Sequence, residues 1–211
     1  MRIMILNGPN LNMLGIREPH IYGSTTLDAI KASCEEFAAF TGTQLAFHQS
    51  NHEGELVDLI QSGRTSADAL IINPAAYSFT SIAIYDAIKI FEGPIYEVHI
   101  SNIHARDELH RHSKLSAAVK GVIAGLGPYG YIVAMQAALQ GAGQLPASLP
   151  ALGSVKPKPH SCLPCASGTR YFSFCSFVPN RKKGMAPSDT CAAIVIAVDA
   201  SARASSMTAS A

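Results

Sequence analysis

Short runs of β-forming residues alternate with segments of helical periodicity between residues 2 and 140, and this alternation limits the fold more than any other feature. The runs occupy residues 2–6, 44–49, 69–73, 95–100 and 121–126. Between them, apolar residues recur at spacings of three and four, as from Leu27 to Phe37. Strands that alternate with amphipathic helices are typical of βαβ units, so we expect a parallel sheet covered by helices.

The helical signals are clearest at residues 27–37, 56–60, 82–91 and 131–140, with a weaker one at 114–119. The first has a threonine before it as N-cap and Gly42 at its end. The next two should stop near Gly63 and Gly93. Right-handed crossovers between parallel strands then predict an α/β fold of the flavodoxin-like, doubly wound kind, with five strands.

Polar residues follow the β-forming runs at the points where the strands should end. They are Asn7, Asn10, Ser50, Asn51, Asn73, His99, Ser101 and Asn102. Because the carboxyl ends of parallel strands meet at one edge of a sheet, we expect these side chains to surround one ligand site.

Composition divides the chain at about residue 141. The 211 residues, 48% apolar and 15% charged, suit one globular domain with some chain left over. Residues 1–141 carry the strand and helix pattern and form the predicted catalytic domain. Residues 142–211 contain Pro, Ser, Ala and Cys without sustained periodicity, so we expect a disordered tail. A strand-like stretch at 191–200 stands alone within it.

The charge balance favours a small-molecule ligand over nucleic acid. A formal net charge of +1 and a pI near 7.7 do not provide the positive field that gathers phosphates. No apolar run approaches the roughly 20 residues that span a bilayer, and the polar segment from Asn7 to Asn10 comes too early for a signal peptide. We therefore expect a cytoplasmic protein without nucleic-acid or membrane partners.

Two motifs of other functions occur in weakened form. GLGPYG at 125–130 fits G-x-G-x-x-G, but the acidic residue that a dinucleotide site needs about 20 positions later is missing. Its glycines are alternatively explained by a tight turn and close packing. The pair Cys162 and Cys165 could open a zinc site with Cys175 and Cys191, yet a second C-x-x-C is absent. We predict no metal and no cofactor.

His99 and Tyr22 offer an acid and a base. His99 stands at a strand end on the ligand-binding edge, and a histidine can give or take a proton near neutral pH. Tyr22 lies five positions after Arg17, and a nearby guanidinium favours the phenolate. Such a pair suits an elimination that takes a proton from carbon and releases a hydroxyl as water. The plainer interpretations are a histidine packed at a strand end and a tyrosine in a surface loop.

Five blocks in order between Met1 and about Gln140 carry a specific resemblance: LNGPNLNMLGIREPHIYG, QSNHEGELVDLIQ, INPAAY, EVHISNIHARDELHRHS and GLGPYGY. Together they resemble the type II 3-dehydroquinate dehydratases of the shikimate and quinate pathways. The resemblance implies a flavodoxin-like fold and a homo-oligomer, a dodecamer built from trimers. It also implies cofactor-free dehydration of 3-dehydroquinate to 3-dehydroshikimate, by anti elimination through an enolate.

The resemblance further implies roles for individual residues. Tyr22 matches the tyrosine that removes the C2 proton, and Arg17 matches the arginine that activates it. His99 matches the acid that protonates the departing C1 hydroxyl, and Asn10 matches an asparagine that holds a water at the enolate.

Other matched positions concern substrate binding. Asn73, with the amides of Ile100 and Ser101, matches the group that orients the substrate hydroxyl and carboxylate. Asp86 matches an aspartate supplied across the trimer interface.

Three positions depart from the family pattern on the side of the site that recognises hydroxyls. Phe79 stands where the family usually has histidine, and His110 and Tyr85 stand where it usually has arginine. Phe79 cannot donate a hydrogen bond, and His110 is a shorter donor than arginine. Three functions therefore remain open: a dehydratase with weakened affinity, a paralogue that acts on a related ring acid, and a catalytically silent carboxylate-binding protein.

Overall fold

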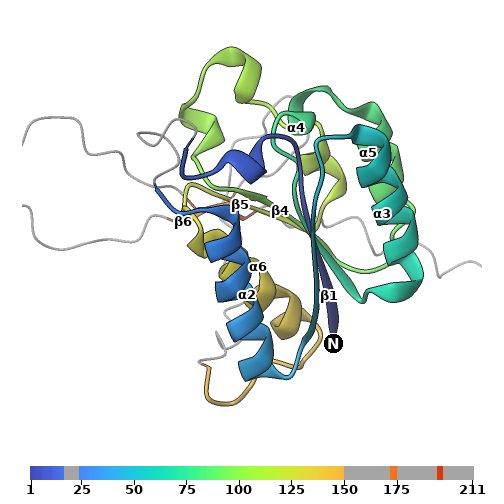
Figure 1. The fold of residues 1–211 in the computed structure, drawn as a ribbon, viewed down its shortest axis with the longest axis vertical. Coiled ribbons are helices and arrows are strands. Elements are labelled where there is room, and N and C mark those ends of the chain that lie inside the picture. Colours follow the sequence, from blue (N-terminus) through green and yellow to red (C-terminus); the bar gives the residue numbers. More distant parts are fainter. Residues whose placement is uncertain (17–23, 150–171, 175–193, 197–211) are drawn as a thin grey trace, which may run out of the picture.

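A computed structural model describes residues 1–16, 24–149, 172–174 and 194–196. Its main sheet has five parallel strands in the order β2-β1-β3-β4-β5 (Figure 1). The strands are β1 (Arg2–Asn7), β2 (Gln44–Gln49), β3 (Ala69–Asn73), β4 (Ile95–His99) and β5 (Gly121–Ala124). This is the flavodoxin-like order, so the predicted fold class is confirmed. Strands β2 and β3 have the predicted bounds, and the ends of β1, β4 and β5 differ from the prediction by one or two residues.

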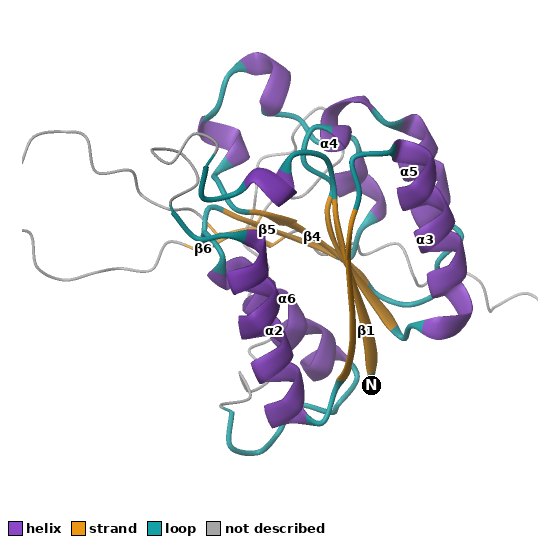
Figure 2. Cartoon of the chain, in the orientation of Figure 1, coloured by secondary structure: helices purple, strands orange, loops and turns teal. Residues whose placement is uncertain are grey.

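Helices cover both faces of the sheet. On one face lie α2 (Leu27–Thr41) and α6 (Tyr129–Gly141), and on the other lie α3 (Glu53–Ser66) and α5 (Ile82–Ile88), as Figure 2 shows. The short α4 (Tyr77–Thr80) and several 3₁₀ turns stand above the carboxyl ends of the strands. Among the described residues, no helix is long and apolar enough to cross a membrane.

The side chains of β1 show how one strand supports two cores. Ile3 and Ile5 are buried under α2 and α6, while Met4 and Leu6 are buried under α3 and α5. Successive side chains of a strand point to opposite faces, so a strand covered on both sides must be apolar throughout. This explains why the β-forming runs read as continuous apolar segments.

The ends of the helices test the predicted stop signals. The Thr26 hydroxyl accepts a hydrogen bond from the Ala29 amide at 3.2 Å, and Gly42 ends α2 with a φ of 67°, as predicted. The stop predicted near Gly63 was wrong by one turn, because α3 continues to Ser66. A Cβ at Gly63 would lie 3.1 Å from the Met4 sulfur, so this glycine serves close packing on the sheet rather than helix termination.

Three further predictions need correction. Helix α5 ends at Ile88 rather than near Gly93, and the weak helical signal at 114–119 is the 3₁₀ turn Leu115–Ala118. In the tail, Ile194–Ile196 (β7) does not stand alone, because it pairs antiparallel with Phe172–Phe174 (β6). The other residues after 149 lie outside the described ranges.

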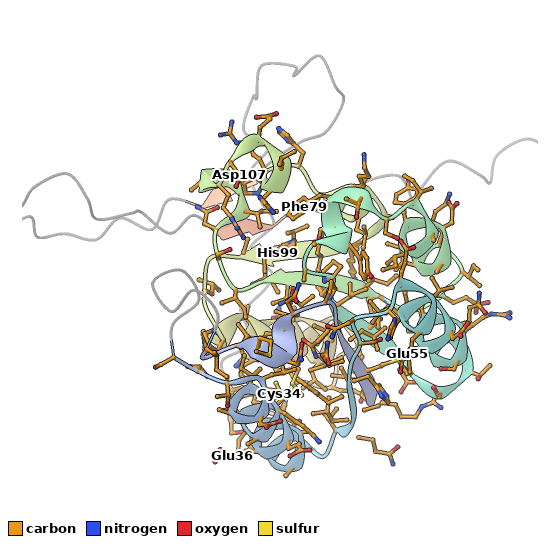
Figure 3. All side chains as sticks on the ribbon, turned by 45° about the horizontal axis from the view of Figure 1, so that its top comes forward. Cys34, Glu36, Glu55, Phe79, His99 and Asp107 are labelled. Carbon is orange, nitrogen blue, oxygen red and sulfur yellow. The ribbon has the colours of Figure 1, made fainter. Side chains whose placement is uncertain are left out.

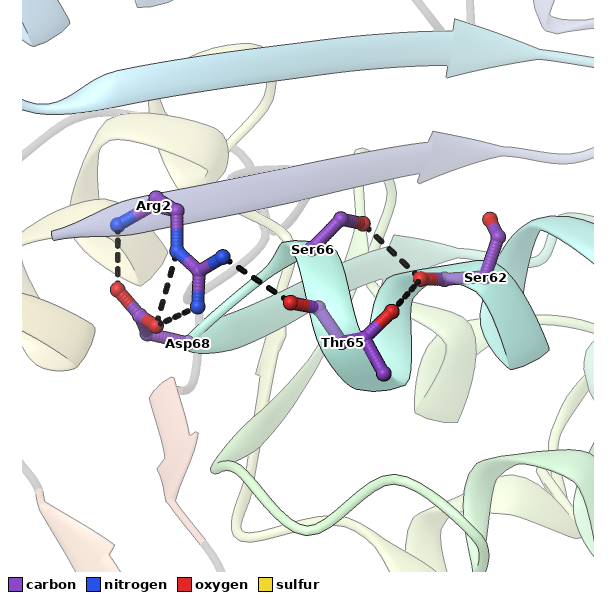
Figure 4. A network of polar contacts seen from close by, with 5 residues as sticks. All are labelled: Arg2, Ser62, Thr65, Ser66 and Asp68. Atoms are coloured by element: carbon purple, nitrogen blue, oxygen red, sulfur yellow. Dashed lines mark hydrogen bonds and ion pairs between the residues drawn. The ribbon is translucent and has the colours of Figure 1, made fainter.

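The amino edge of the sheet is fastened by one ion pair, drawn in Figure 4. The Arg2 guanidinium contacts the Asp68 carboxylate at 2.6 Å and donates to the Thr65 carbonyl at 3.0 Å. The Arg2 amide also donates to Asp68 at 2.8 Å. These contacts join the start of β1 to the last turn of α3 and to Asp68, which directly precedes β3.

Candidate active site

A pocket opens at the carboxyl edge of the sheet, where the topology predicts it. It is lined by residues that follow β1, β3 and β4: Pro9, Asn10, Leu11, Leu14, Asn73, Ala75, Ala76, Phe79, His99, Ile100, Ser101, Ile103, Arg106 and His110. Seven of the predicted site residues are therefore brought together, namely Asn10, Asn73, Phe79, His99, Ile100, Ser101 and His110. These residues come from segments that are far apart in the sequence, so the fold brings them together.

Close backbone approaches position the loop after β1, which lines the pocket. The Gly8 amide donates to the Asn73 carbonyl at 2.8 Å, and a Cβ at Gly8 would lie only 2.3 Å from the Pro74 carbonyl oxygen. No residue other than glycine fits there. Asn10 follows in the left-handed region with a φ of 65°, and its amide donates to the Asn51 side-chain oxygen at 2.9 Å. The loop after β1 is thereby held against those after β2 and β3.

His99 is the last residue of β4, is 5% exposed and is paired with a carboxylate of its own strand. Its Nε2 lies 2.8 Å from Oε1 of Glu97, which is fully buried two residues earlier on the same face of the sheet. Ser113 donates to the same oxygen at 2.5 Å, and Ser116 donates to Oε2 at 2.6 Å. Both carboxylate oxygens therefore have partners.

The surroundings of Glu97 keep it ionised. Burial by itself would raise the pKa of the Glu97 carboxyl, but the adjacent His99 and the hydrogen bonds from His99, Ser113 and Ser116 outweigh burial and lower that pKa. An ionised carboxylate only accepts hydrogen bonds, so the proton between the two side chains belongs to His99 Nε2. Nδ1 is then the ring nitrogen through which His99 can exchange a proton with a ligand.

Phe79 packs between two histidines of the pocket. Its ring stacks on His99 with centroids 6.4 Å apart and an interplanar angle of 22°, and it meets the His110 ring edge-on at 5.4 Å. His110 Nδ1 lies 2.8 Å from both carboxylate oxygens of Asp107, and this hydrogen bond lowers the pKa of the Asp107 carboxyl. Figure 3 shows Phe79, His99 and Asp107 grouped at one end of the molecule.

Asp86 does not line this pocket. It lies on the exposed side of α5, where its carboxylate is 3.4 Å from the Lys89 ammonium. The same ammonium lies 5.0 Å from the centroid of the Tyr85 ring, so two predicted positions form one surface cluster with Lys89.

Two groups of predicted residues lie outside the described ranges. Arg17 and Tyr22 fall within residues 17–23, and the cysteines at 162, 165, 175 and 191 fall within the tail. In the described part of the chain, no group of three or more His, Cys, Asp or Glu side chains is placed to hold a metal ion.

The GLGPYG segment supports the site through its backbone. Gly125 and Gly127 have φ values of 82° and 59°, and a Cβ at Gly125 would lie 3.2 Å from the Asn102 Cβ. Their amides donate to the carbonyls of His99 at 3.2 Å and Ile100 at 3.0 Å. The glycines therefore permit a tight turn that fastens the end of β4.

Comparison with known proteins identifies the relatives of this chain. Residues 1–139 match the protein family described as dehydroquinase class II. The chain belongs to this family. It is 53% identical over 135 residues to the 3-dehydroquinate dehydratase 1 of Agrobacterium fabrum, and this alignment covers 64% of this chain and 93% of that protein. It is also 53% identical over 134 residues to the catabolic 3-dehydroquinase of Emericella nidulans, covering 64% and 88% of the two chains.

Solved dehydroquinase structures share the fold. The type II dehydroquinase from Butyrivibrio crossotus superposes with a TM-score of 0.63 at 39% identity, over 64% of this chain and 94% of that one. The dehydroquinases thus match the part of the chain that contains the sheet and the pocket, and the tail lies beyond the matched residues.

Sequence reasoning missed three polar residues of this dehydroquinase site. The sequence could have indicated Glu97, because side chains two residues apart in a strand point to the same face of the sheet. A buried glutamate on the face of His99 also needs a polar partner. Arg106 lines the pocket and brings a positive charge that suits an anionic ligand. Tyr131 is buried in α6 and reaches Asn73 across 58 positions, a contact without a local signal.

Proposed function

We propose that this protein dehydrates 3-dehydroquinate to 3-dehydroshikimate. The observation that carries the proposal is the His99–Glu97 pair at the pocket, in a chain whose residues 1–139 match the class II dehydroquinases. A proton-exchanging nitrogen beside a small polar pocket is what an elimination of water requires. One relative is named 3-dehydroquinate dehydratase 1 and another catabolic 3-dehydroquinase, which supports this substrate.

The reaction is assigned to an acid and a base on two segments. Tyr22, activated by Arg17, removes the C2 proton, and the electron pair of the C–H bond forms an enolate with the C3 carbonyl. The enolate then collapses, the C1–oxygen bond breaks, and His99 gives its Nδ1 proton to the hydroxyl, which leaves as water. The roles of Tyr22 and Arg17 rest on the family resemblance, and that of His99 rests also on its place in the pocket.

Glu97 prepares His99 for this step. Because the carboxylate accepts the Nε2 proton at 2.8 Å, the ring is fixed in orientation and presents Nδ1. When Nδ1 is also protonated, the carboxylate balances the positive charge of the ring inside the protein. Loss of the Nδ1 proton to the leaving hydroxyl therefore returns the pair to one negative charge.

The remaining pocket residues are assigned to substrate orientation. Asn10 holds a water at the enolate oxygen, and Asn73 with the Ile100 and Ser101 amides orients the hydroxyl and carboxylate. Phe79 and His110 occupy the side that recognises ring hydroxyls. Because a phenyl ring donates no hydrogen bond, we expect affinity for the substrate to be about ten- to a hundredfold weaker than with histidine at this position.

We also propose a cytoplasmic homo-oligomer, a dodecamer built from trimers. Asp86 is exposed on α5 and does not line the pocket of its own subunit, which suits a carboxylate that completes the site of a neighbour. Light scattering coupled to size exclusion would give the mass of the assembly, and a monomer of 22.3 kDa would exclude this arrangement.

An ultraviolet assay with 3-dehydroquinate tests the function, because the product gains a conjugated enone carboxylate. We expect the wild-type protein to generate product and both Tyr22→Phe and His99→Asn to abolish it. His112→Asn is the matched control, since His112 is an exposed histidine in the same segment and does not line the pocket. Absence of product at high substrate concentration with the wild-type protein would refute the proposal.

A further inference from the structure

Three buried side chains on the α2 and α6 face of the sheet form a continuous chain of hydrogen bonds that ends in the pocket. Asn7 and Asn73 are the last residues of β1 and β3 and lie opposite each other in the parallel register. Tyr131 of α6 rises beneath them, and its hydroxyl donates to Asn7 Oδ1 at 2.7 Å and accepts from Asn73 Nδ2 at 2.8 Å. Of the three, only Asn73 lines the pocket.

The direction of every bond in this chain is fixed by its two ends. At one end, the Ala75 amide can only donate, and it lies 3.3 Å from Asn73 Oδ1. At the other end, the His48 carbonyl can only accept, and Asn7 Nδ2 lies 2.9 Å from it. The Asn73 nitrogen and the Asn7 oxygen must therefore face Tyr131. The Tyr131 hydroxyl donates its single hydrogen to the Asn7 oxygen and accepts a hydrogen bond from the Asn73 nitrogen.

Burial keeps the Tyr131 phenol protonated and fixes the orientation of both asparagine side chains. The residue is completely buried, and burial raises the pKa of its hydroxyl, so the phenol stays neutral and keeps its hydrogen. A buried amide or hydroxyl without a partner is unfavourable, so neither asparagine can turn its side chain over without leaving polar atoms unpaired.

We propose that Tyr131 is a positioning residue, which fixes the Asn73 amide with one N–H held by the phenol and the second N–H available to an oxygen of the substrate. Among the described residues, that second N–H has no hydrogen-bond partner. The inference rests on the proposed function, because it assigns Tyr131 to the binding of the same substrate. Tyr131 itself does not line the pocket, so it acts only through Asn73.

The test compares two tyrosine hydroxyls of the same core. Tyr131→Phe removes the phenol from the chain, whereas Tyr96→Phe removes a hydroxyl that donates to the Ala137 carbonyl at 3.2 Å and touches no pocket residue. We expect Tyr131→Phe to raise KM for 3-dehydroquinate about tenfold with kcat within about threefold. Tyr96→Phe should leave both constants unchanged, although it too loses a hydrogen bond, a partly buried one.

A double substitution separates positioning from a general structural effect. If Tyr131 acts through Asn73, then in an Asn73→Ala background the Tyr131→Phe change should alter KM by less than about twofold. Independent, multiplicative effects of the two changes would overturn the inference, as would a Tyr131→Phe enzyme with wild-type KM. If Tyr131→Phe does not fold, Asn7→Ala supplies the same test, because it releases the hydroxyl hydrogen and should also raise KM.

The controls distinguish this inference from the proposed function. Turnover by the wild-type and Tyr96→Phe proteins reports on the function, whereas the difference between the two tyrosine variants reports on positioning. Active proteins with equal KM would overturn the positioning role and leave the dehydratase in place. Inactive wild-type and Tyr96→Phe proteins would overturn both.

Discussion

The carboxylate of Glu97 offers a sharp test of how the site works, because Glu97→Gln removes its charge and keeps its shape. Oε1 of Glu97 accepts from His99 Nε2 at 2.8 Å and from Ser113 at 2.5 Å, and Oε2 accepts from Ser116 at 2.6 Å. A glutamine oxygen can keep the first two bonds. The amide nitrogen that replaces Oε2 can donate to Ser116 once that hydroxyl turns, so no buried polar atom is left unpaired.

The expected magnitudes follow from those three contacts. A hydrogen bond to a charged group contributes about 1.5–3 kcal/mol and a neutral one about 0.5–1.5 kcal/mol, so three contacts lose roughly 3 kcal/mol of stability. Removal of a buried charge relieves a desolvation penalty of several kcal/mol, which offsets this loss. We therefore expect the free energy of unfolding to change by less than about 2 kcal/mol. By contrast, kcat should fall about a hundredfold, because the protonated His99 ring loses its balancing charge.

Two measurements decide this prediction: the ultraviolet assay with 3-dehydroquinate and urea unfolding. Glu55→Gln is the matched control, since Glu55 also accepts a serine hydroxyl, from Ser50 at 2.5 Å, but is exposed and does not line the pocket. A kcat of Glu97→Gln within about threefold of wild type would refute the assigned role of the charge. A loss of more than about 4 kcal/mol in unfolding free energy would refute the assumed compensation.

The pH dependence of the free energy of unfolding gives a second test of the Glu97 carboxylate. The pKa of Glu97 in the folded protein lies below its ordinary value of 4.5. Its contribution to stability is therefore fully present above that value and is lost as the pH falls through the lower, folded pKa. Glutamine does not titrate, so the stability difference between wild type and Glu97→Gln should shift in favour of the variant as the pH falls below 4.5.

Three further predictions concern other parts of the molecule. The double change Phe79→His, His110→Arg should lower KM for 3-dehydroquinate about tenfold or more, and an unchanged or higher KM in the ultraviolet assay would contradict the account of the altered pocket. Ser78→Ala should be neutral or stabilising by up to about 1 kcal/mol in urea unfolding, because the buried Ser78 hydroxyl has no hydrogen-bond partner among the described residues. In a variant with the four tail cysteines changed to serine, the Cys34 thiol should react with a thiol reagent at pH 8 only after unfolding, because burial raises its pKa to about 12. Rapid reaction of the folded protein would contradict this.

The sheet was predictable because each strand carries its own signal. Ile3 to Leu6 face two covered sides and must all be apolar, and that run is visible in the sequence. Gly63 shows the limit, since a glycine can end a helix or let it approach a strand, and only the position of Met4 in space decides between them. The prediction chose the helix end, and packing was the actual cause.

The site was predictable where topology alone determines it. Asn73 and His99 come together because parallel strands share one carboxyl edge. The partners of these residues were not predictable in the same way. Tyr131 meets Asn7 across 124 positions, and nothing in the residues around Tyr131 indicates that its hydroxyl points to a strand end rather than to solvent.

The two polar networks lie on opposite faces of the sheet, and this separation divides their functions. Glu97 belongs to the α3 and α5 face and serves His99, whereas Asn7 and Tyr131 belong to the α2 and α6 face and serve Asn73. No hydrogen bond between described side chains links one network to the other. A change in the Glu97 network should therefore act mainly on kcat and one in the Tyr131 network mainly on KM, and combined changes should multiply.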